Sequence, residues 1–532
     1  MNKAAVTYAV GKMMQILGAI LLVPLGFAFY DFRGLSFSLI VSQPDMIGLI
    51  AGVVLAALGG TFLTMRFRQG KGAQGVREGF AIVTIAWVSM TFCTSLPLFF
   101  HLVTQNGIGF ASVFTAFTDA FFETMSGYTT TGATIITNIE ALPRSILFIR
   151  ALSHWLGGMG IITLAIAILP SMGVTAYSMF KGEMPGPSKD RFRPRLAQTV
   201  SVLWGVYVLF TAIETGLLWI GGMNLFESIC HSFATMATGG FSTENGSVAA
   251  YNSDFIEWVI IVFMYLAGVN FILHFKALRG DFKPMLGSVE FKFYNGIIVG
   301  TILIASLMLH WGGLAPIDEA SRHYRHSTWT EETFAEHYEQ QAEQVGTLYG
   351  AIRVSTFQTV AIVTTTGFAT ADFDLWPEFL RFLLVFLMFF GGCAGSTGGG
   401  MKMIRVLLVV RVAWTVLRKI AQPRLVLPVK IGRQVIDDNQ VVNVVAFFIL
   451  FTSLFIVTGL LMTLFVPDLT TALTCSIATI GNIGPGLAGV GAVENYSWIP
   501  LPGKWILILS MLLGRLEIFT VLILFRPAVW RK

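Results

Sequence analysis

Apolar stretches of about 20 residues recur along the whole chain and alternate with short polar connections. A helix needs about 20 apolar residues, at about 1.5 Å each, to cross the roughly 30 Å hydrocarbon core of a bilayer. The pattern predicts ten membrane-spanning helices, near residues 10–30, 46–66, 79–102, 147–170, 198–221, 255–275, 293–312, 379–418, 441–466 and 502–526. An even number of crossings places both termini on the same side of the membrane.

Composition supports a membrane protein. Hydrophobic residues make up 55% of the chain and charged residues 12%, against about 25% charged residues in soluble domains. The first apolar stretch resembles a secretory signal, but Tyr30-Asp31-Phe32-Arg33 follows it instead of a small-residue cleavage site. We therefore expect a retained first helix.

Lys and Arg residues concentrate in alternate connections, near residues 66–77, 181–195, 276–292 and 402–433, and at both ends of the chain. By the positive-inside rule this face is cytoplasmic, so both termini are expected in the cytoplasm. The net charge of +5 then reflects orientation and not nucleic-acid binding. The opposite connections are acidic, and the largest, about residues 312–346, is interpreted as an external cap.

Four outer connections contain an apolar run that is too short to span the membrane. The runs end in Thr129-Thr130-Thr131-Gly132, Ala237-Thr238-Gly239-Gly240, Thr364-Thr365-Thr366-Gly367 and Thr479-Ile480-Gly481-Asn482. Because a predicted spanning helix lies before and after each run, the chain repeats one unit four times: helix, short re-entrant helix, glycine loop, helix. Small residues also allow close helix packing in membranes, but packing does not explain four loops in equivalent positions.

Such loops are suited to passing a cation. A potassium ion exchanges its water shell for other oxygens, and consecutive backbone carbonyls supply them when they point at one axis. Glycine adopts the required positive φ at little cost, and irregular backbone at membrane depth is tolerated where it lines a cavity. The predicted filter residues are Thr130, Thr131, Gly132, Thr238, Gly239, Thr365, Thr366, Gly367, Thr479, Ile480, Gly481 and Asn482. Potassium is expected at Gly132, Gly239, Gly367 and Gly481.

Each short helix would run inward and direct the negative end of its dipole at the cation. Asp119, Glu227 and Asp468 precede their loops by a similar distance and suit the N-termini of the short helices, where an acid is favourable. The third loop breaks this pattern, because Arg353 and Val354 stand there. The fourth loop also differs, with Ile480 and Asn482 beside its glycine, so the filter is only approximately fourfold.

Two further features suggest a gate. The segment from Gly391 to Gly400 carries the glycines Gly391, Gly392, Gly395, Gly398, Gly399 and Gly400. Glycine costs about 1 kcal/mol per residue in a helix interior, so we expect the helix to unwind there; close helix packing is the alternative. Arg515 lies deep in the last span and is expected to face the pore or to join a salt bridge, although Glu517 is on another helix face.

The four loops, the glycine-rich segment and Gly514-Arg515 resemble the Trk/Ktr/HKT superfamily of potassium transporters, most closely its bacterial TrkH-type pore subunits. The resemblance implies an all-α polytopic membrane fold: four pore repeats, at 76–195, 196–280, 288–435 and 436–532, after an extra helix pair at 1–70. It also implies that the four glycines line the filter and that the glycine-rich segment obstructs the pore until a regulator moves it. The expected function is potassium uptake across the bacterial inner membrane, by a homodimer under a cytoplasmic, TrkA-like nucleotide-binding subunit.

Other functions remain as alternatives. An ion-coupled symporter would bind its substrate between inverted repeats, whereas these four repeats share one orientation; only Glu214, Glu517 and a few histidines could carry coupled protons or sodium. A membrane enzyme would need a nucleophile with a base or a metal cluster. The sequence has no HExxH or CxxC pattern, and His154 beside Ser153 is more simply a polar helix residue. We expect no enzymatic activity and no cofactor, with K⁺ as the transported ion.

Overall fold

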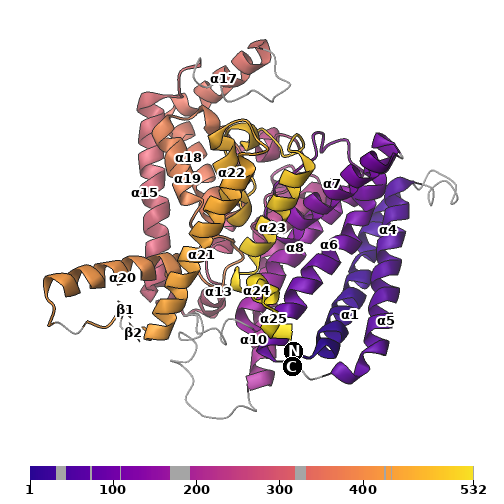
Figure 1. Ribbon diagram of the computed structural model, residues 1–532. Helices are drawn as coiled ribbons and strands as arrows, with labels where there is room; N and C mark the ends of the chain where they lie inside the picture. Colours follow the sequence, from indigo (N-terminus) through magenta and orange to yellow (C-terminus); the bar gives the residue numbers. More distant parts are fainter. Residues whose placement is uncertain are drawn as a thin grey trace.

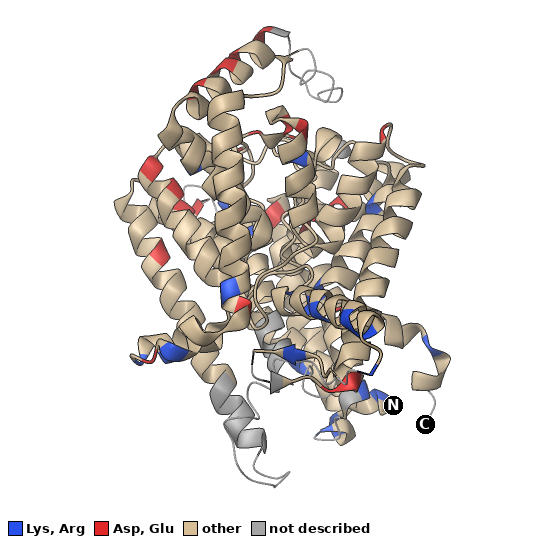
Figure 2. Ribbon diagram, turned by 90° about the vertical axis from the view of Figure 1, so that its left-hand side faces the viewer, with Lys and Arg blue, Asp and Glu red and all other residues tan. Residues whose placement is uncertain are grey.

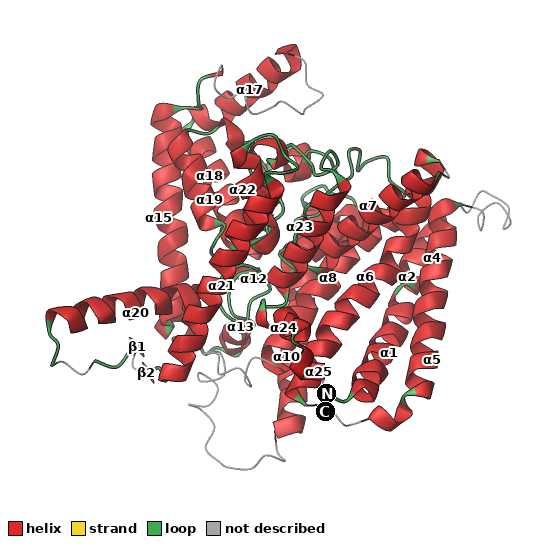
Figure 3. Cartoon of the chain, viewed as in Figure 1, coloured by secondary structure: helices red, strands yellow, loops and turns green. Residues whose placement is uncertain are grey.

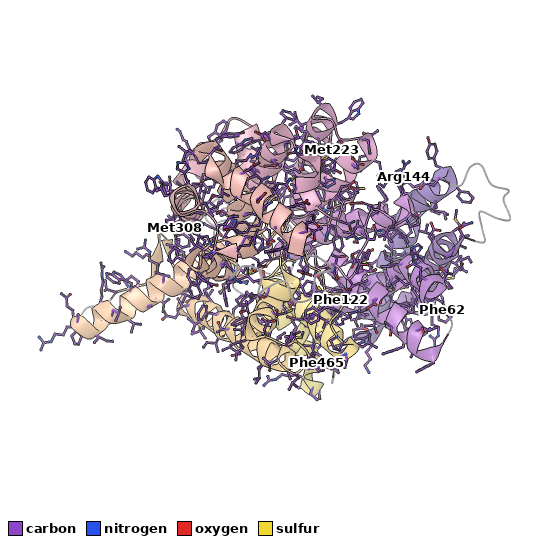
Figure 4. All side chains as sticks on the ribbon, turned by 90° about the horizontal axis from the view of Figure 1, so that it is seen from above. Phe62, Phe122, Arg144, Met223, Met308 and Phe465 are labelled. Atoms are coloured by element: carbon purple, nitrogen blue, oxygen red, sulfur yellow. The ribbon has the colours of Figure 1, made fainter. Side chains whose placement is uncertain are left out.

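The computed structural model describes residues 1–31, 43–71, 75–107, 109–167, 192–317, 331–424, 427–432 and 434–530. Figure 3 shows helices joined by loops, and the described strands form one short hairpin, β1 (Lys430–Ile431) paired with β2 (Gln434–Val435). Seen from above in Figure 4, Phe122 lies in the interior and Phe62 on the rim. Phe62 is 65% exposed, as expected for a surface that contacts lipid.

The N-terminal segment forms two apolar helical stretches that pack against α6 (Val76–Asn106). They comprise α1 (Lys3–Ile20), α2 (Leu22–Asp31), α4 (Pro44–Val54), a π-helical turn at Leu55–Gly59, α5 (Gly60–Arg66) and a 3-10 turn at Arg68–Gly70. The two stretches are in close contact at Gly11 and Gly60, where an added Cβ would collide with the opposite helix.

The rest of the described chain forms four units of one kind, each a long helix, a short helix, a loop and another helix. They are α6 (Val76–Asn106), α7 (Phe110–Tyr128) and α8 (Arg144–Ala167); α10 (Phe192–Ile220), α11 (Leu225–Met236), α12 (Asp254–Ala267) and α13 (Phe271–Leu278); α15 (Val289–Gly312), α18 (Leu348–Val363), α19 (Glu378–Leu387) and α20 (Met403–Ala421); and α21 (Asp438–Met462), α22 (Leu469–Ile480), α23 (Leu501–Arg515) and α24 (Phe519–Leu522). In every unit the short helix packs against the long helix before it.

Small helices complete the described part: α14 (Lys283–Gly287), α17 (Glu331–Gly346), α25 (Pro527–Trp530) and 3-10 turns at Ser247–Tyr251, Phe373–Leu375, Ala488–Val490 and Ile523–Phe525. Figure 1 shows both termini together at one end and the cap helix α17 at the other. In Figure 2 Lys and Arg gather at the end with the termini, whereas Asp and Glu predominate at the opposite end. The basic connection at 181–195 lies largely outside the described residues.

Two of the ten predicted crossings are bent in the structure. Within the described residues six helices are long and apolar enough to span a bilayer, or eight if each of two bent pairs is one span. The expected spans at 255–275 and 502–526 are those bent pairs, with angles of 105° and 110°. Asn270 caps α13 and starts a new direction, while Glu517 and Ile518 have positive φ and break the last span. The span at 379–418 is interrupted, as expected from its glycine-rich segment, and α20 projects sideways in Figure 1.

Candidate functional site

The four loops leave their short helices in the same way. In each loop the first residue after the helix cap has a left-handed backbone: Thr130, Thr238, Thr365 and Asn482, with φ of 48°, 54°, 60° and 55°. Two residues further on stands a glycine with positive φ: Gly132, Gly240, Gly367 and Gly484. The N–H of the residue between them donates to a carbonyl near the helix end, at 2.8 to 2.9 Å in all four loops. We call these three positions inner, middle and outer.

The loops also close a ring. A Cβ added at Gly132 would lie under 3.0 Å from the carbonyl oxygen of Gly239, the middle residue of the second loop. The same relation joins each outer glycine to the next middle residue: Gly240 to Thr366, Gly367 to Ile483, and Gly484 to Thr131. Each outer position therefore packs directly on a neighbouring carbonyl, and only glycine fits.

This geometry corrects the register expected from the sequence in two loops. Gly239 is a middle residue, and Gly481 caps α22 with an ordinary helical φ of −77°. The equivalents of Gly132 and Gly367 are Gly240 and Gly484. Thr479 and Ile480 likewise belong to α22 and not to the loop. The expected register aligned the loops by their Thr-Gly pairs. In the fourth loop, however, Asn482 takes the left-handed inner position that Thr holds in the other loops, and Asn tolerates this conformation better than most residues.

Side chains of the short helices support the loops, and sequence reasoning missed them. Glu123, His231 and Gln358 each stand nine residues before their outer glycine. Glu123 accepts from the Ile135 N–H at 2.9 Å, and His231 Nε2 lies 3.0 Å from Ser242 Oγ. The Gln358 amide oxygen, turned toward its loop, accepts from the Thr370 N–H at 2.8 Å. The sequence signal that could have identified them is a polar residue at the same position of three apolar helices, nine residues before the glycine.

In the fourth loop this position is Cys475, and its neighbour takes over the supporting role. The Thr474 hydroxyl accepts from the Leu487 N–H at 3.1 Å and lies the same distance from the Leu487 carbonyl. The short helix of each unit thus bonds to the residues that follow its own loop, at a backbone N–H in the first, third and fourth units and at the Ser242 hydroxyl in the second.

The acidic residues expected at the helix N-termini divide into two groups. Asp468 caps α22, accepting from the Thr471 N–H at 2.7 Å, and Glu227 lies in the first turn of α11, as predicted. Asp119 does not fit, because α7 begins at Phe110 and Asp119 lies in its middle. There it pairs with Lys504 Nζ of α23 at 2.6 Å.

A similar contact between a short helix and a helix of the neighbouring unit explains why the third unit carries Arg353. This arginine, on α18, pairs with Asp254 and lies 3.3 Å from Glu257, both on α12 of the preceding unit. Lys504 and Glu257 are each the fourth residue of their helix. In the first unit the short helix α7 carries the acid and the neighbouring helix α23 the base. In the third unit the short helix α18 carries the base and the neighbouring helix α12 the acids.

Outside the loops lies a pocket of about 130 Å³, lined by the four outer glycines and by polar residues of the outer turns. Glu244 and Glu494 contribute carboxylates to this pocket, and Arg150 is also part of its wall. Burial, with a smaller contribution from Asp374, raises the pKa of Glu494 to about 7. The pocket therefore carries more negative charge above neutral pH than below it.

The glycine-rich segment does unwind, as predicted: α19 ends at Leu387 and α20 starts at Met403. Between them the chain lies directly against the inner positions, where the Gly399 N–H donates to Thr365 Oγ1 at 2.6 Å. Glu290 Oε1 of α15 holds the segment from behind by accepting from the N–H groups of Ala394 and Ile404 at 2.7 and 3.1 Å. The same backbone that ends one helix therefore sits beneath the four loops.

Arg515 reaches this segment. The residue is 2% exposed, and its guanidinium donates to the carbonyl oxygens of Thr397 at 2.8 Å and Gly157 at 3.2 Å. No carboxylate pairs with it in the described part of the chain, and Glu517 pairs with Arg405 instead. Arg515 thus joins the segment to α8.

A second cation missed by sequence reasoning acts on the same segment. The Lys402 ammonium bonds to the carbonyl of Gly398 and lies 3.4 Å from Ser396 Oγ. Glu214, in contrast, is fully buried in α10, and neither of its oxygens has a hydrogen bond of normal geometry to another described residue.

Comparison with known proteins shows which protein family the chain resembles. A family model described as a cation transport protein, TrkH, matches residues 48–532. The chain is 35% identical over 536 residues to the Trk system potassium uptake protein TrkH of Escherichia coli strain K12, covering all of both chains. It is 31% identical over 458 residues to TrkG of the same strain, covering 86% of each chain.

A solved structure agrees with these matches. The crystal structure of the potassium transporter TrkH from Vibrio parahaemolyticus superposes with a TM-score of 0.81 at 34% identity, over the full length of both chains. The relatives are named as transport proteins and not as enzymes. This chain is a membrane protein of the TrkH family of cation transporters.

Proposed function

We propose that the protein takes up potassium by conducting it through the ring of four loops. The closed ring of middle carbonyls and outer glycines carries this proposal, because several backbone oxygens around one axis can replace the water shell of a potassium ion. The four short helices end at this ring and direct their negative dipole ends toward it. The ion-binding positions are then the inner, middle and outer residues of each loop, with Gly240 and Gly484 replacing Gly239 and Gly481 as outer residues.

The pore is assembled from the units 76–195, 196–280, 288–435 and 436–532, and the helices of residues 1–70 pack outside them. The segment from Gly391 to Gly400 and Arg515 form the gate beneath the filter. The contact of Gly399 with Thr365 supports this role, since it places backbone next to an inner position.

The protein works in the bacterial inner membrane with both termini in the cytoplasm. The gathering of Lys and Arg at the end with the termini supports this orientation (Figure 2). By family resemblance it forms a homodimer, and a cytoplasmic TrkA-like nucleotide-binding subunit opens the gate. Potassium is the transported ion, and no cofactor is required.

Recording from purified protein in lipid bilayers with mixed potassium and sodium salts tests the filter. Gly132→Ser should raise sodium permeation relative to potassium, because its side chain would displace the Gly239 carbonyl. Gly205→Ser is the control, since nothing lies within 4 Å of a Cβ added there. If both variants keep the parental reversal potential, Gly132 is not part of a filter.

The alternative is coupled symport. Flux that depends on an imposed proton or sodium gradient and saturates at a slow rate would favour it, whereas rapid flux driven by potassium alone would favour a pore. Glu214, fully buried and without a hydrogen bond of normal geometry to another described residue, is the carboxyl best suited to carry a coupled ion, so Glu214→Gln should then abolish coupling.

A further inference from the structure

An ion pair behind the ring joins two of the loops. Glu123 of α7 and Arg150 of α8 are 1% and 4% exposed, and Arg150 Nε donates to Glu123 Oε1 at 2.9 Å. The other oxygen of Glu123 accepts from the Ile135 N–H at 2.9 Å, just after the first loop. Arg150 Nη1 donates to the Ser242 carbonyl at 2.9 Å, just after the second loop.

Arg150 contacts the chain just after the second loop at two residues, the Ser242 carbonyl and the Phe241 ring. The Arg150 guanidinium lies 4.2 Å from the centre of the Phe241 ring, within cation–π distance. An unbroken chain of charge-assisted contacts therefore runs from the first loop through Glu123 and Arg150 to the second. Such hydrogen bonds are shorter and more directional than neutral ones.

The other units carry no carboxylate at the position of Glu123. They carry His231, Gln358 and Cys475 there, and the side-chain hydrogen bonds of His231 and Gln358 to described residues stay within their own unit. The third and fourth units are linked from a different position, because Asp374 pairs with Arg381 and accepts from the Ala488 N–H at 3.0 Å, after the fourth loop.

A second buried ion pair shows what a purely structural role looks like. Asp119 and Lys504 also join two units, at 2.6 Å, and Lys504 is 3% exposed. Among the described residues neither side chain bonds to one of the four loops, whereas both members of the Glu123–Arg150 pair hold residues two or three positions after an outer glycine.

We propose that Glu123 and Arg150 are positioning residues that fix the first and second loops relative to each other and so set the preference for potassium over sodium. The proposal rests on the proposed filter function. A cage that is free to contract would accommodate the smaller sodium ion, and the ion pair resists this contraction on one side of the ring.

The experiment compares Glu123→Gln with Asp119→Asn in bilayer recordings under mixed potassium and sodium salts. Each substitution neutralises one carboxylate of a buried ion pair. Glu123→Gln should raise sodium permeability relative to potassium about tenfold, which corresponds to about 1.4 kcal/mol. Asp119→Asn should keep the parental ratio even where its melting temperature falls.

Arg150→Lys provides a second variant if Glu123→Gln does not fold. It keeps the charge, but an ammonium cannot reproduce the fork that holds Glu123 and Ser242 together, so an intermediate rise is expected. An unchanged ratio in a folded Glu123→Gln or Arg150→Lys protein, or an equal change in Asp119→Asn, would overturn the proposal. If Gly132→Ser also leaves the ratio unchanged, the filter itself is wrong; if it shifts the ratio, only the positioning role fails.

Discussion

The contact between the glycine-rich segment and the third loop gives a sharp test of the gate. The Gly399 N–H donates to Thr365 Oγ1 at 2.6 Å, and Thr365 is fully buried. Thr365→Val keeps the shape of the side chain but leaves this amide without an acceptor. An unpaired buried polar group costs about 1 to 3 kcal/mol, so the equilibrium of the segment should shift roughly 5- to 150-fold toward the displaced state.

The measurement is basal potassium flux into liposomes without any regulatory subunit, and Thr365→Val should raise it. Thr130→Val is the matched control, because Thr130 holds the same inner position in the first loop, with φ of 48° against 60°. The Thr130 hydroxyl has no hydrogen-bond partner among the described residues, so its loss should leave the segment in place. Equal flux through the two variants, or no increase in Thr365→Val, would refute the reasoning.

Three further predictions concern neighbouring features. Arg515→Gln should raise basal flux because it loses two charge-assisted bonds to the Thr397 and Gly157 carbonyls, whereas Arg515→Lys should stay nearer the parent; loss of folded protein in the neutral variant alone would instead indicate a structural role. Lowering the external pH from about 8 to about 6 should reduce flux at low potassium, because Glu494, with a pKa of about 7, becomes neutral in the outer pocket; Glu494→Gln should flatten this pH profile, and an unaltered profile would contradict it. Arg353→Met should lower the melting temperature in detergent by leaving Asp254 and buried Glu257 without their partner, and a parental melting temperature would show that this contact contributes little.

Local pattern was sufficient for much of the fold. The apolar stretches predicted most helices, because their length must match the bilayer whatever they pack against. The unwinding between Leu387 and Met403 was also predictable, since six glycines disfavour a helix in any surroundings. The caps at Asp468 and near Glu227 follow from the same local chemistry.

Contacts between distant segments decided the rest. The register of the second and fourth loops depends on which residue meets the carbonyl of the next loop, so Gly240 and Gly484 could not be chosen over Gly239 and Gly481 from Thr-Gly pairs. Arg353 looked like an exception until its acidic partners on α12 were placed beside it. The sequence by itself therefore determined a helical membrane protein with four glycine loops, since hydropathy and backbone preference act within one segment. Only the tertiary structure decided which residues form the ring and which pair behind it, because these contacts depend on how separate helices and loops pack together. Asn482 with Thr131, Ala488 with Asp374 and Lys504 with Asp119 are examples, each joining residues more than a hundred positions apart.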